Sequence, residues 1–236
     1  MKSAPVRWHG FDGIGVLMAF IGFVVIAAAM NIGFATALLL SLATHEAGRV
    51  LAYRQLGLGQ TNVRFLPLVT GVQISENQPR NDTELAYASL MGAGLSLGPM
   101  ALSMSLWALT KDVAGPLSGY FLVLGTTIGA LNFVLLLPFW RLPGRFCADV
   151  AARAFWPALS PGLAAFFGAA LLVGGLRNAS IALVLLGAYG LTSIFRKRAA
   201  RSKPMSTDDA LTALAAYVFT FAAHFSAAAL LAQALF

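Results

Sequence analysis

The chain has 236 residues, of which 58% are hydrophobic and only 11% are charged, and its mean hydropathy is +0.77. A water-soluble domain carries about a quarter charged residues, so this composition excludes a soluble globular protein. The net charge of +7 comes from basic residues between hydrophobic segments, a pattern that the positive-inside rule explains without nucleic acid as a partner.

Seven hydrophobic segments are predicted to be membrane-spanning helices, because each approaches the roughly 20 apolar residues that cross a bilayer. They cover residues 13–31, 33–56, 85–109, 118–139, 161–176, 179–195 and 210–235. The fifth and sixth are short. The predicted fold is therefore an all-α polytopic membrane protein with about six to seven transmembrane helices in one membrane domain, residues 1–236.

Residues 57–84, between the second and third helices, have a different composition. They are rich in glycine, β-branched and turn residues, and polar and apolar residues alternate in "TNVRF" and "TGVQI". This pattern indicates a short β-like hairpin. At membrane depth a strand is tolerated only where protein shields its backbone.

The positions of the basic residues predict the orientation. With the N-terminus inside, most of the 16 basic residues fall on the cytoplasmic side, whereas Lys111 and Arg177 fall outside. We therefore expect an integral protein of a bacterial-type plasma (inner) membrane, surrounded by lipid, with a cytoplasmic N-terminus.

His45, Glu46 and Arg49 are the ionisable residues well inside the first two predicted helices. Such groups cost a few kcal/mol each to insert, so they are candidates for a functional site. In the H-E-x-x-H motif two histidines hold zinc from adjacent helical turns, and the glutamate takes a proton from the metal-bound water. Here Arg49 stands at the position of the second histidine.

Four stretches, from about residue 40 to 146, follow one another as a series of motifs. They are "THEAGRVLAYRQLGLG", "RFLPLVTGVQI", "NDTELAYASLMGAGLSL" and "LNFVLLLPFWRLPGR". In this series the chain resembles the site-2 protease family of intramembrane zinc metalloproteases. The resemblance implies a protease-like core at about residues 33–146 and additional C-terminal helices at 161–236.

The chain also departs from the family pattern. Pro138, Leu142 and Gly144 match the last motif, but Asn132 stands six residues before Pro138 instead of three, and Ala93 stands where a proline is usual.

The departures that matter most concern the metal. The resemblance implies zinc ligands at the positions of His45, Arg49 and Pro143, and a base at Glu46. Arginine stays protonated and has no lone pair to donate, and proline has no side-chain donor. Only one of the three protein ligands that a catalytic zinc needs is therefore retained.

Two other residues could replace the lost ligands. Asp149 lies six positions after Pro143, and His224 lies in the middle of the last predicted helix. The alternative for Asp149 is an ion pair with Arg145 or Arg153. The alternative for His224 is a buried, hydrogen-bonded contact between helices.

The same region also has structural interpretations. Glu46 and Arg49 would form an intrahelical ion pair that makes both charges tolerable in lipid. His45 would hydrogen-bond Asn132 and tie two helices together. The glycines of residues 92–98 would let helices approach closely, and the aromatic residues at 139–140 and 155–156 would be interfacial anchors.

Three functions remain open on these residues. The first, which we predict, is a non-catalytic pseudoprotease that needs no cofactor and binds transmembrane or extended peptide segments of other membrane proteins. The second is an active zinc metalloendopeptidase that cleaves transmembrane substrates with atypical ligands. The third is a small transporter or channel component, which ranks last because too few polar groups converge in the bilayer.

Overall fold

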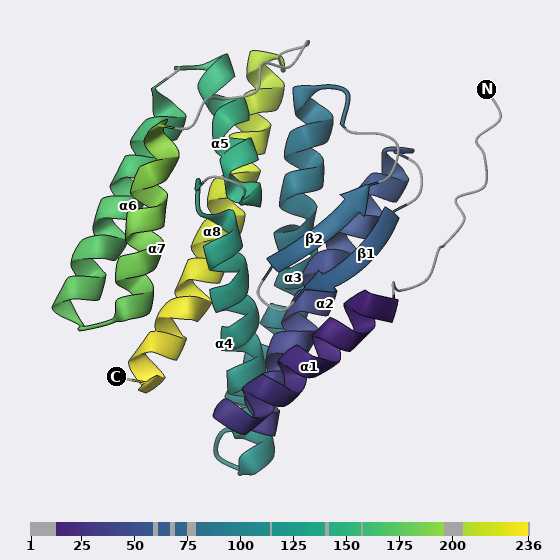
Figure 1. Ribbon diagram of the computed structural model, residues 1–236, viewed down its shortest axis with the longest axis vertical. Helices are drawn as coiled ribbons and strands as arrows, with labels where there is room; N and C mark the ends of the chain where they lie inside the picture. Colours follow the sequence, from purple (N-terminus) through teal and green to yellow (C-terminus); the bar gives the residue numbers. More distant parts are fainter. Residues whose placement is uncertain are drawn as a thin grey trace. The chain divides into compact units, whose positions relative to one another are not determined.

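A computed structural model of the chain describes residues 13–58, 61–66, 69–74, 79–113, 115–139, 142–156, 158–195 and 205–235 (Figure 1). The chain forms two compact units, each assembled from separate stretches of sequence. Unit 1 comprises Met1–Gln78, Met91–Val134 and Thr220–Phe236, and unit 2 comprises Pro79–Leu90 and Leu135–Phe219. The expected single domain with a core at about 33–146 stays a prediction.

Most of the described residues are helical. The elements, in chain order, are α1 (Gly13–Ala29), α2 (Ile32–Gln55), β1 (Thr61–Leu66), β2 (Val69–Ile74), α3 (Asp82–Thr110), α4 (Pro116–Leu136), α5 (Pro143–Ala154), α6 (Leu159–Arg177), α7 (Ile181–Thr192), the short 3-10 helix η1 (Ser193–Phe195) and α8 (Thr207–Leu235). A helix overlaps each of the seven predicted spans, and α5 is an additional one.

Four helices in the described part of the chain are long and apolar enough to cross a membrane. They are α3, α4, α6 and, up to Leu230, α8. Residues Ala19–Ala29 of α1 and the segment Ile181–Phe195 are apolar but shorter, and α2, which contains His45, is not among the four. The chain is thus a helical membrane protein, as its composition predicts, while the count of six to seven crossings stays a prediction.

Side-chain caps fix where two of these helices begin. The Asn31 side chain accepts a hydrogen bond from the backbone N–H of Phe34 at 2.8 Å, which caps α2. At the start of α3, the Asn81 side chain accepts from the Glu84 N–H at 2.8 Å, and the Glu84 carboxylate accepts from the Arg80 N–H at 2.7 Å. Both arrangements satisfy N–H groups that have no partner inside the helix.

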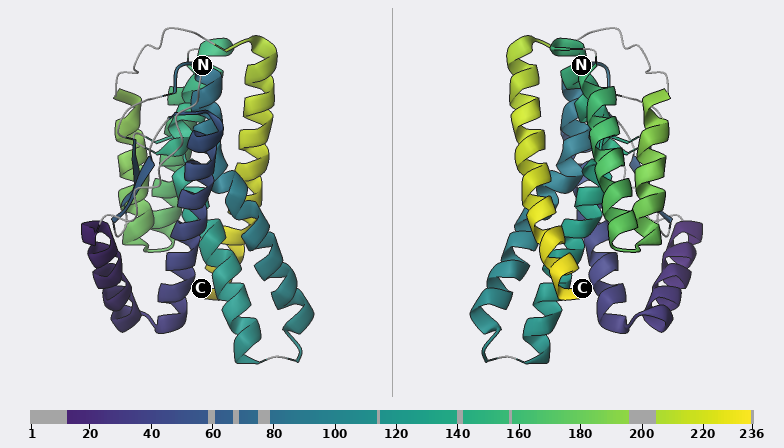
Figure 2. Two further views of the ribbon diagram at one scale, coloured as in Figure 1. Left: turned by 90° about the vertical axis from the view of Figure 1, so that its right-hand side faces the viewer. Right: turned by 90° about the vertical axis from the view of Figure 1, so that its left-hand side faces the viewer.

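In unit 1, α1 packs against α2 and against β1, and both strands contact α2. Figure 2 shows α1 and α2 as an antiparallel pair. The strands pair antiparallel, from Thr61 opposite Ile74 to Leu66 opposite Val69. They fall within the segment predicted to be a β-like hairpin, whose turn residues 67–68 lie outside the described part.

A glycine lets α2 and α3 approach each other closely within unit 1. A Cβ on Gly48 would overlap the Met91 carbonyl oxygen and stand 2.9 Å from the Cβ of Leu95. By contrast, a Cβ on Gly94 or Gly98 would have no neighbour within 4 Å. The predicted packing role of residues 92–98 therefore does not apply to every glycine of the run.

In unit 2, α6 and α7 form a tight helical hairpin (Figure 1). A Cβ on Gly175 would stand 2.6 Å from the backbone nitrogen of Val184, and one on Gly187 would stand 2.5 Å from that of Leu172. Small residues at these positions let the two backbones come this close.

The prediction of an interfacial anchor was wrong for Phe139. This ring is fully buried in unit 2, where it packs against Gly190 and lies edge-on to Tyr189 with 6.4 Å between ring centroids. A glycine on α7 leaves the space that the ring fills. Phe155 and Trp156, in contrast, are 39% and 63% exposed.

Candidate functional site

His45 is held in unit 1 by a hydrogen bond between α2 and α4. Its Nδ1 lies 2.7 Å from Oδ1 of Asn132, and its side chain is 1% exposed. The Asn132 amide is oriented by its own Nδ2, which donates to the Ile128 carbonyl at 2.9 Å. Since Oδ1 can only accept, Nδ1 of His45 carries the proton and donates. The predicted contact between His45 and Asn132 is therefore present.

The second nitrogen of His45 is buried beside α3. A Cβ on Gly92 would stand 2.7 Å from Nε2 and 2.6 Å from Cε1, so the ring lies directly against the glycine backbone. Within the described part of the chain, Nε2 has no hydrogen-bond partner. Because the proton is on Nδ1, a neutral His45 has an unshared lone pair on Nε2.

Glu46 and Arg49 form the predicted ion pair. Nη1 of Arg49 lies 3.2 Å from Oε1 of Glu46, and the glutamate is 2% exposed. Its Oε2 is buried and has no hydrogen-bond partner among the described residues. The Glu46 carboxylate is thus paired with the Arg49 guanidinium.

His224, on α8, also lies in unit 1 and is fully buried. Its Nε2 lies 3.1 Å from the carbonyl oxygen of Ala93 on α3, so Nε2 is the protonated donor. This confirms the predicted hydrogen-bonded contact between helices. Its Nδ1 is buried and has no partner among the described residues.

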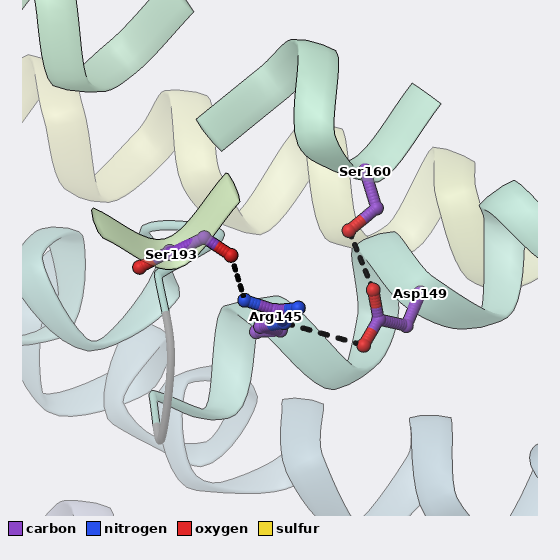
Figure 3. Close-up of polar contacts among 4 residues, drawn as sticks. All are labelled: Arg145, Asp149, Ser160 and Ser193. Atoms are coloured by element: carbon purple, nitrogen blue, oxygen red, sulfur yellow. Dashed lines mark hydrogen bonds and ion pairs between the residues drawn. The ribbon is translucent and has the colours of Figure 1, made fainter. Parts of the chain in front are cut away.

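Asp149 lies in unit 2, where both of its carboxylate oxygens are in use (Figure 3). Oδ1 accepts a hydrogen bond from the Ser160 hydroxyl at 2.5 Å, and Oδ2 lies 3.4 Å from Nε of Arg145. The same arginine donates from Nη1 to the Ser193 carbonyl at 2.8 Å. Of the two pairings predicted for Asp149, the one with Arg145 is present, whereas the side chain of Arg153 lies outside the described part.

Pro143 is the first residue of α5, where the missing N–H of proline has no cost. A Cβ on the next residue, Gly144, would overlap the carbonyl oxygen of Leu136. That carbonyl, at the end of α4, also accepts a hydrogen bond from the Tyr217 hydroxyl at 2.7 Å. Pro143 and Gly144 therefore have local structural roles in unit 2.

The donor set does not fit a zinc ion. A catalytic zinc needs three protein donors and a water, and no three His, Cys, Asp or Glu side chains of the described residues come together as such a group. Arg49 adds a fixed positive charge one helical turn from His45.

Sequence reasoning missed the backbone partners of this region. Gly92 is in contact with the His45 ring, and the Ala93 carbonyl binds His224. Similarly, the Ser193 carbonyl binds Arg145. A backbone carbonyl has no signature in the sequence, so only the glycine-rich run pointed to this part of α3.

No protein-family model matches the chain, and no curated protein matches it. Among solved structures, the chain is similar to Site-2 Protease from Methanocaldococcus jannaschii, with 13% sequence identity and a TM-score of 0.47. The similarity covers 80% of this chain and 91% of that one.

Proposed function

We propose that the chain is a site-2-protease-like membrane protein that has lost zinc binding and proteolysis and binds segments of other membrane proteins. The observation that carries this proposal is the ion pair between Arg49 and Glu46. The resemblance in sequence places Arg49 at a zinc-ligand position and Glu46 at the position of the catalytic base. Because the two side chains bind each other, neither is available for the hydrolysis of a peptide bond.

The electrostatics of the pair supports this proposal. The Arg49 guanidinium already binds Oε1 of the Glu46 carboxylate, so this oxygen is held by a cation. The arginine also repels a divalent cation from the adjacent His45. Since one imidazole cannot supply three zinc ligands, Glu46 has no activated water to deprotonate.

The proposed arrangement in the membrane follows the charge pattern. We place the N-terminus in the cytoplasm and count six to seven crossings, with α2 among them, in a bacterial-type plasma membrane. This orientation puts His45 in the cytoplasmic half of the bilayer.

The proposed binding element is the antiparallel pair of β1 and β2. A two-stranded sheet has outer edges whose backbone groups can pair with an added strand, and extended peptides bind to sheets in this way. Among the residues that the structure describes, the ladder joins β1 to β2 and to no further strand. A partner whose transmembrane helix unwinds at one end would supply a strand of the right kind.

Two measurements test this function. The first is cleavage of a single-pass reporter protein by the full chain in liposomes, for which we expect no zinc-dependent product from the wild type. Zinc-dependent cleavage that is lost in Glu46→Gln would instead establish the active metalloendopeptidase.

The second measurement is hydrogen exchange of β1 and β2 in the presence of an extended valine-rich peptide. Its control is the same peptide with alternate backbone amides N-methylated, which cannot complete a strand ladder. We expect protection of the strand amides by the first peptide alone. Equal protection by both, or by neither, would contradict strand addition.

A further inference from the structure

The ion pair between Arg49 and Glu46 is open on the arginine side. Nη1 of Arg49 donates to Oε1 of Glu46 at 3.2 Å, and no other residue in the described part of the chain accepts from this guanidinium. Oε2 of Glu46 is enclosed by the chain, whereas the Arg49 side chain is 17% exposed, and neither its Nε nor its Nη2 is among the enclosed atoms that lack a partner. Most of the N–H donors of Arg49 are therefore available to a ligand.

Arg49 does not project from the exposed stripe of α2. This stripe follows intervals of seven, four and three residues along the helix and consists of Leu40, Ala47, Leu51 and Arg54. Arg49 is two residues away from Ala47 and from Leu51, which is about 200° around an α-helix. Its side chain therefore starts from the opposite side of α2.

On that side, α2 meets α3 within unit 1. His45, one turn before Arg49, lies against Gly92, and a Cβ on Gly48 would overlap the carbonyl oxygen of Met91. A ligand of Arg49 is therefore expected from a segment that packs on this side of α2, rather than from the surroundings of the exposed stripe.

The position of Arg49 along α2 makes further hydrogen bonds valuable. Arg49 lies six residues before the end of the helix at Gln55, or about 9 Å along the axis. A cation in the apolar part of a bilayer is costly, and charge-assisted hydrogen bonds offset that cost. Glu46 supplies one such bond, and the remaining donors can accept a second anionic partner.

The shape of a guanidinium group favours a carboxylate as that partner. Its planar fork of N–H groups matches the two oxygens of a carboxylate, and it offers more than one edge for such a contact. In the extended segments of the proposed function, aspartate and glutamate side chains are the source of carboxylates.

We infer that Arg49 binds an aspartate or glutamate side chain of the partner segment, so that the chain selects segments that carry an acidic residue at this depth. The inference rests on the proposed function and names the chemistry of the segment bound there. Arg49 thus recognises the partner in addition to pairing with Glu46.

Two labelled peptides test the inference with the full chain in nanodiscs of phosphatidylcholine. They are a valine-rich extended peptide with one glutamate and the same peptide with glutamine at that position. Fluorescence anisotropy measures the dissociation constant of each. Because charge-assisted hydrogen bonds are stronger than neutral ones, we expect the wild type to bind the glutamate peptide about 10-fold more tightly.

Three variants separate Arg49 from the other charges of α2. Glu46→Gln keeps the guanidinium and removes the competing carboxylate, so the preference should persist or increase. Glu46→Gln/Arg49→Met should bind both peptides equally. Arg54→Met, at an exposed arginine of the same helix, is the matched control and should keep the wild-type ratio. Helical circular dichroism checks that the variants fold.

Equal affinity of the folded wild type for the two peptides would overturn the inference, as would a preference that survives in the folded double variant. Protection of the strand amides by both peptides in hydrogen exchange would show that the proposed strand addition stands even then. Binding of neither peptide would contradict the proposed function itself.

Discussion

Nη1 of Arg49 lies 3.2 Å from Oε1 of Glu46, one turn along α2. The resemblance to site-2 proteases places a zinc ligand and a catalytic base at these two positions, and here the two side chains neutralise each other. The pair also explains how two charges are kept in a mostly apolar helix, since each one lowers the cost of burying the other.

Removing the arginine alone should destabilise the protein. Arg49→Met leaves the buried Glu46 carboxylate without its cation, and we expect the free energy of unfolding to fall by about 1.5–3 kcal/mol. The double variant Glu46→Gln/Arg49→Met should recover most of that loss, because no unpaired charge remains. Unfolding in mixed micelles measures both. An unchanged stability in Arg49→Met would contradict the account of the pair.

A methyl group on Gly92 should disturb His45. In Gly92→Ala the new Cβ would stand 2.6–2.9 Å from three atoms of the ring, so the ring has to shift from its present position. We expect a loss of about 1–3 kcal/mol in the free energy of unfolding. Gly94→Ala, on the same helix with open space around it, is the matched control and should be neutral or stabilising. Equal behaviour of the two variants would argue against the close contact.

The buried cluster of Arg145, Asp149 and Ser160 should stabilise unit 2. Arg145→Met removes the guanidinium from Asp149 and this donor from the Ser193 carbonyl, so we expect a loss of about 1.5–3 kcal/mol in the free energy of unfolding. Arg177→Met, at an exposed arginine at the end of α6, is the control and should change stability by no more than about 0.5 kcal/mol. A small effect in both would show that the cluster contributes little.

Cys147 should be unreactive in the folded protein. It is 6% exposed on α5, and burial raises the pKa of its thiol to about 12. Because the thiolate is the reactive form, iodoacetamide should not modify Cys147 at pH 8 until the chain is unfolded. Thr207→Cys, at an exposed position at the start of α8, should add one rapidly modified thiol. Mass spectrometry counts the modified cysteines, and rapid labelling of the folded wild type would contradict the burial.

The same group adds a dependence of stability on pH. Below about pH 9, the ordinary pKa of a cysteine thiol, the thiol is protonated in both the folded and the unfolded chain. As the pH rises from there toward 12, the unfolded chain loses the proton first. The contribution of Cys147 to stability should therefore fall over this range.

Local features of the sequence predicted much of the fold. The seven hydrophobic segments coincide with helices because apolar runs of this length bury their backbone groups best as helices. Some helices begin or end a few residues from the predicted position, because a side-chain cap fixes the end. The Asn81 side chain, for example, caps α3, which begins three residues before the predicted position. The short helix α5 was not among the predicted segments, because its 12 residues are too few and too polar for a membrane span.

The side-chain contacts of the site could be predicted where both partners lie close in sequence or carry a recognisable polar group. Glu46 with Arg49 is an example of the first kind, and His45 with Asn132 of the second. Phe139 shows the limit. As one of the aromatic residues at 139–140 it was predicted to be an anchor in the interface, but its burial depends on Gly190, about fifty residues away in sequence.

The most direct test of the central claim is the zinc content of the purified chain, measured by elemental mass spectrometry after zinc loading and removal of excess metal. The double variant Arg49→His/Pro143→Asp, which restores the ligand types of the family pattern, is measured beside it. We predict less than stoichiometric zinc in the wild type and about one zinc per chain in the variant. One zinc per wild-type chain would contradict the loss of the metal site and favour an active metalloprotease.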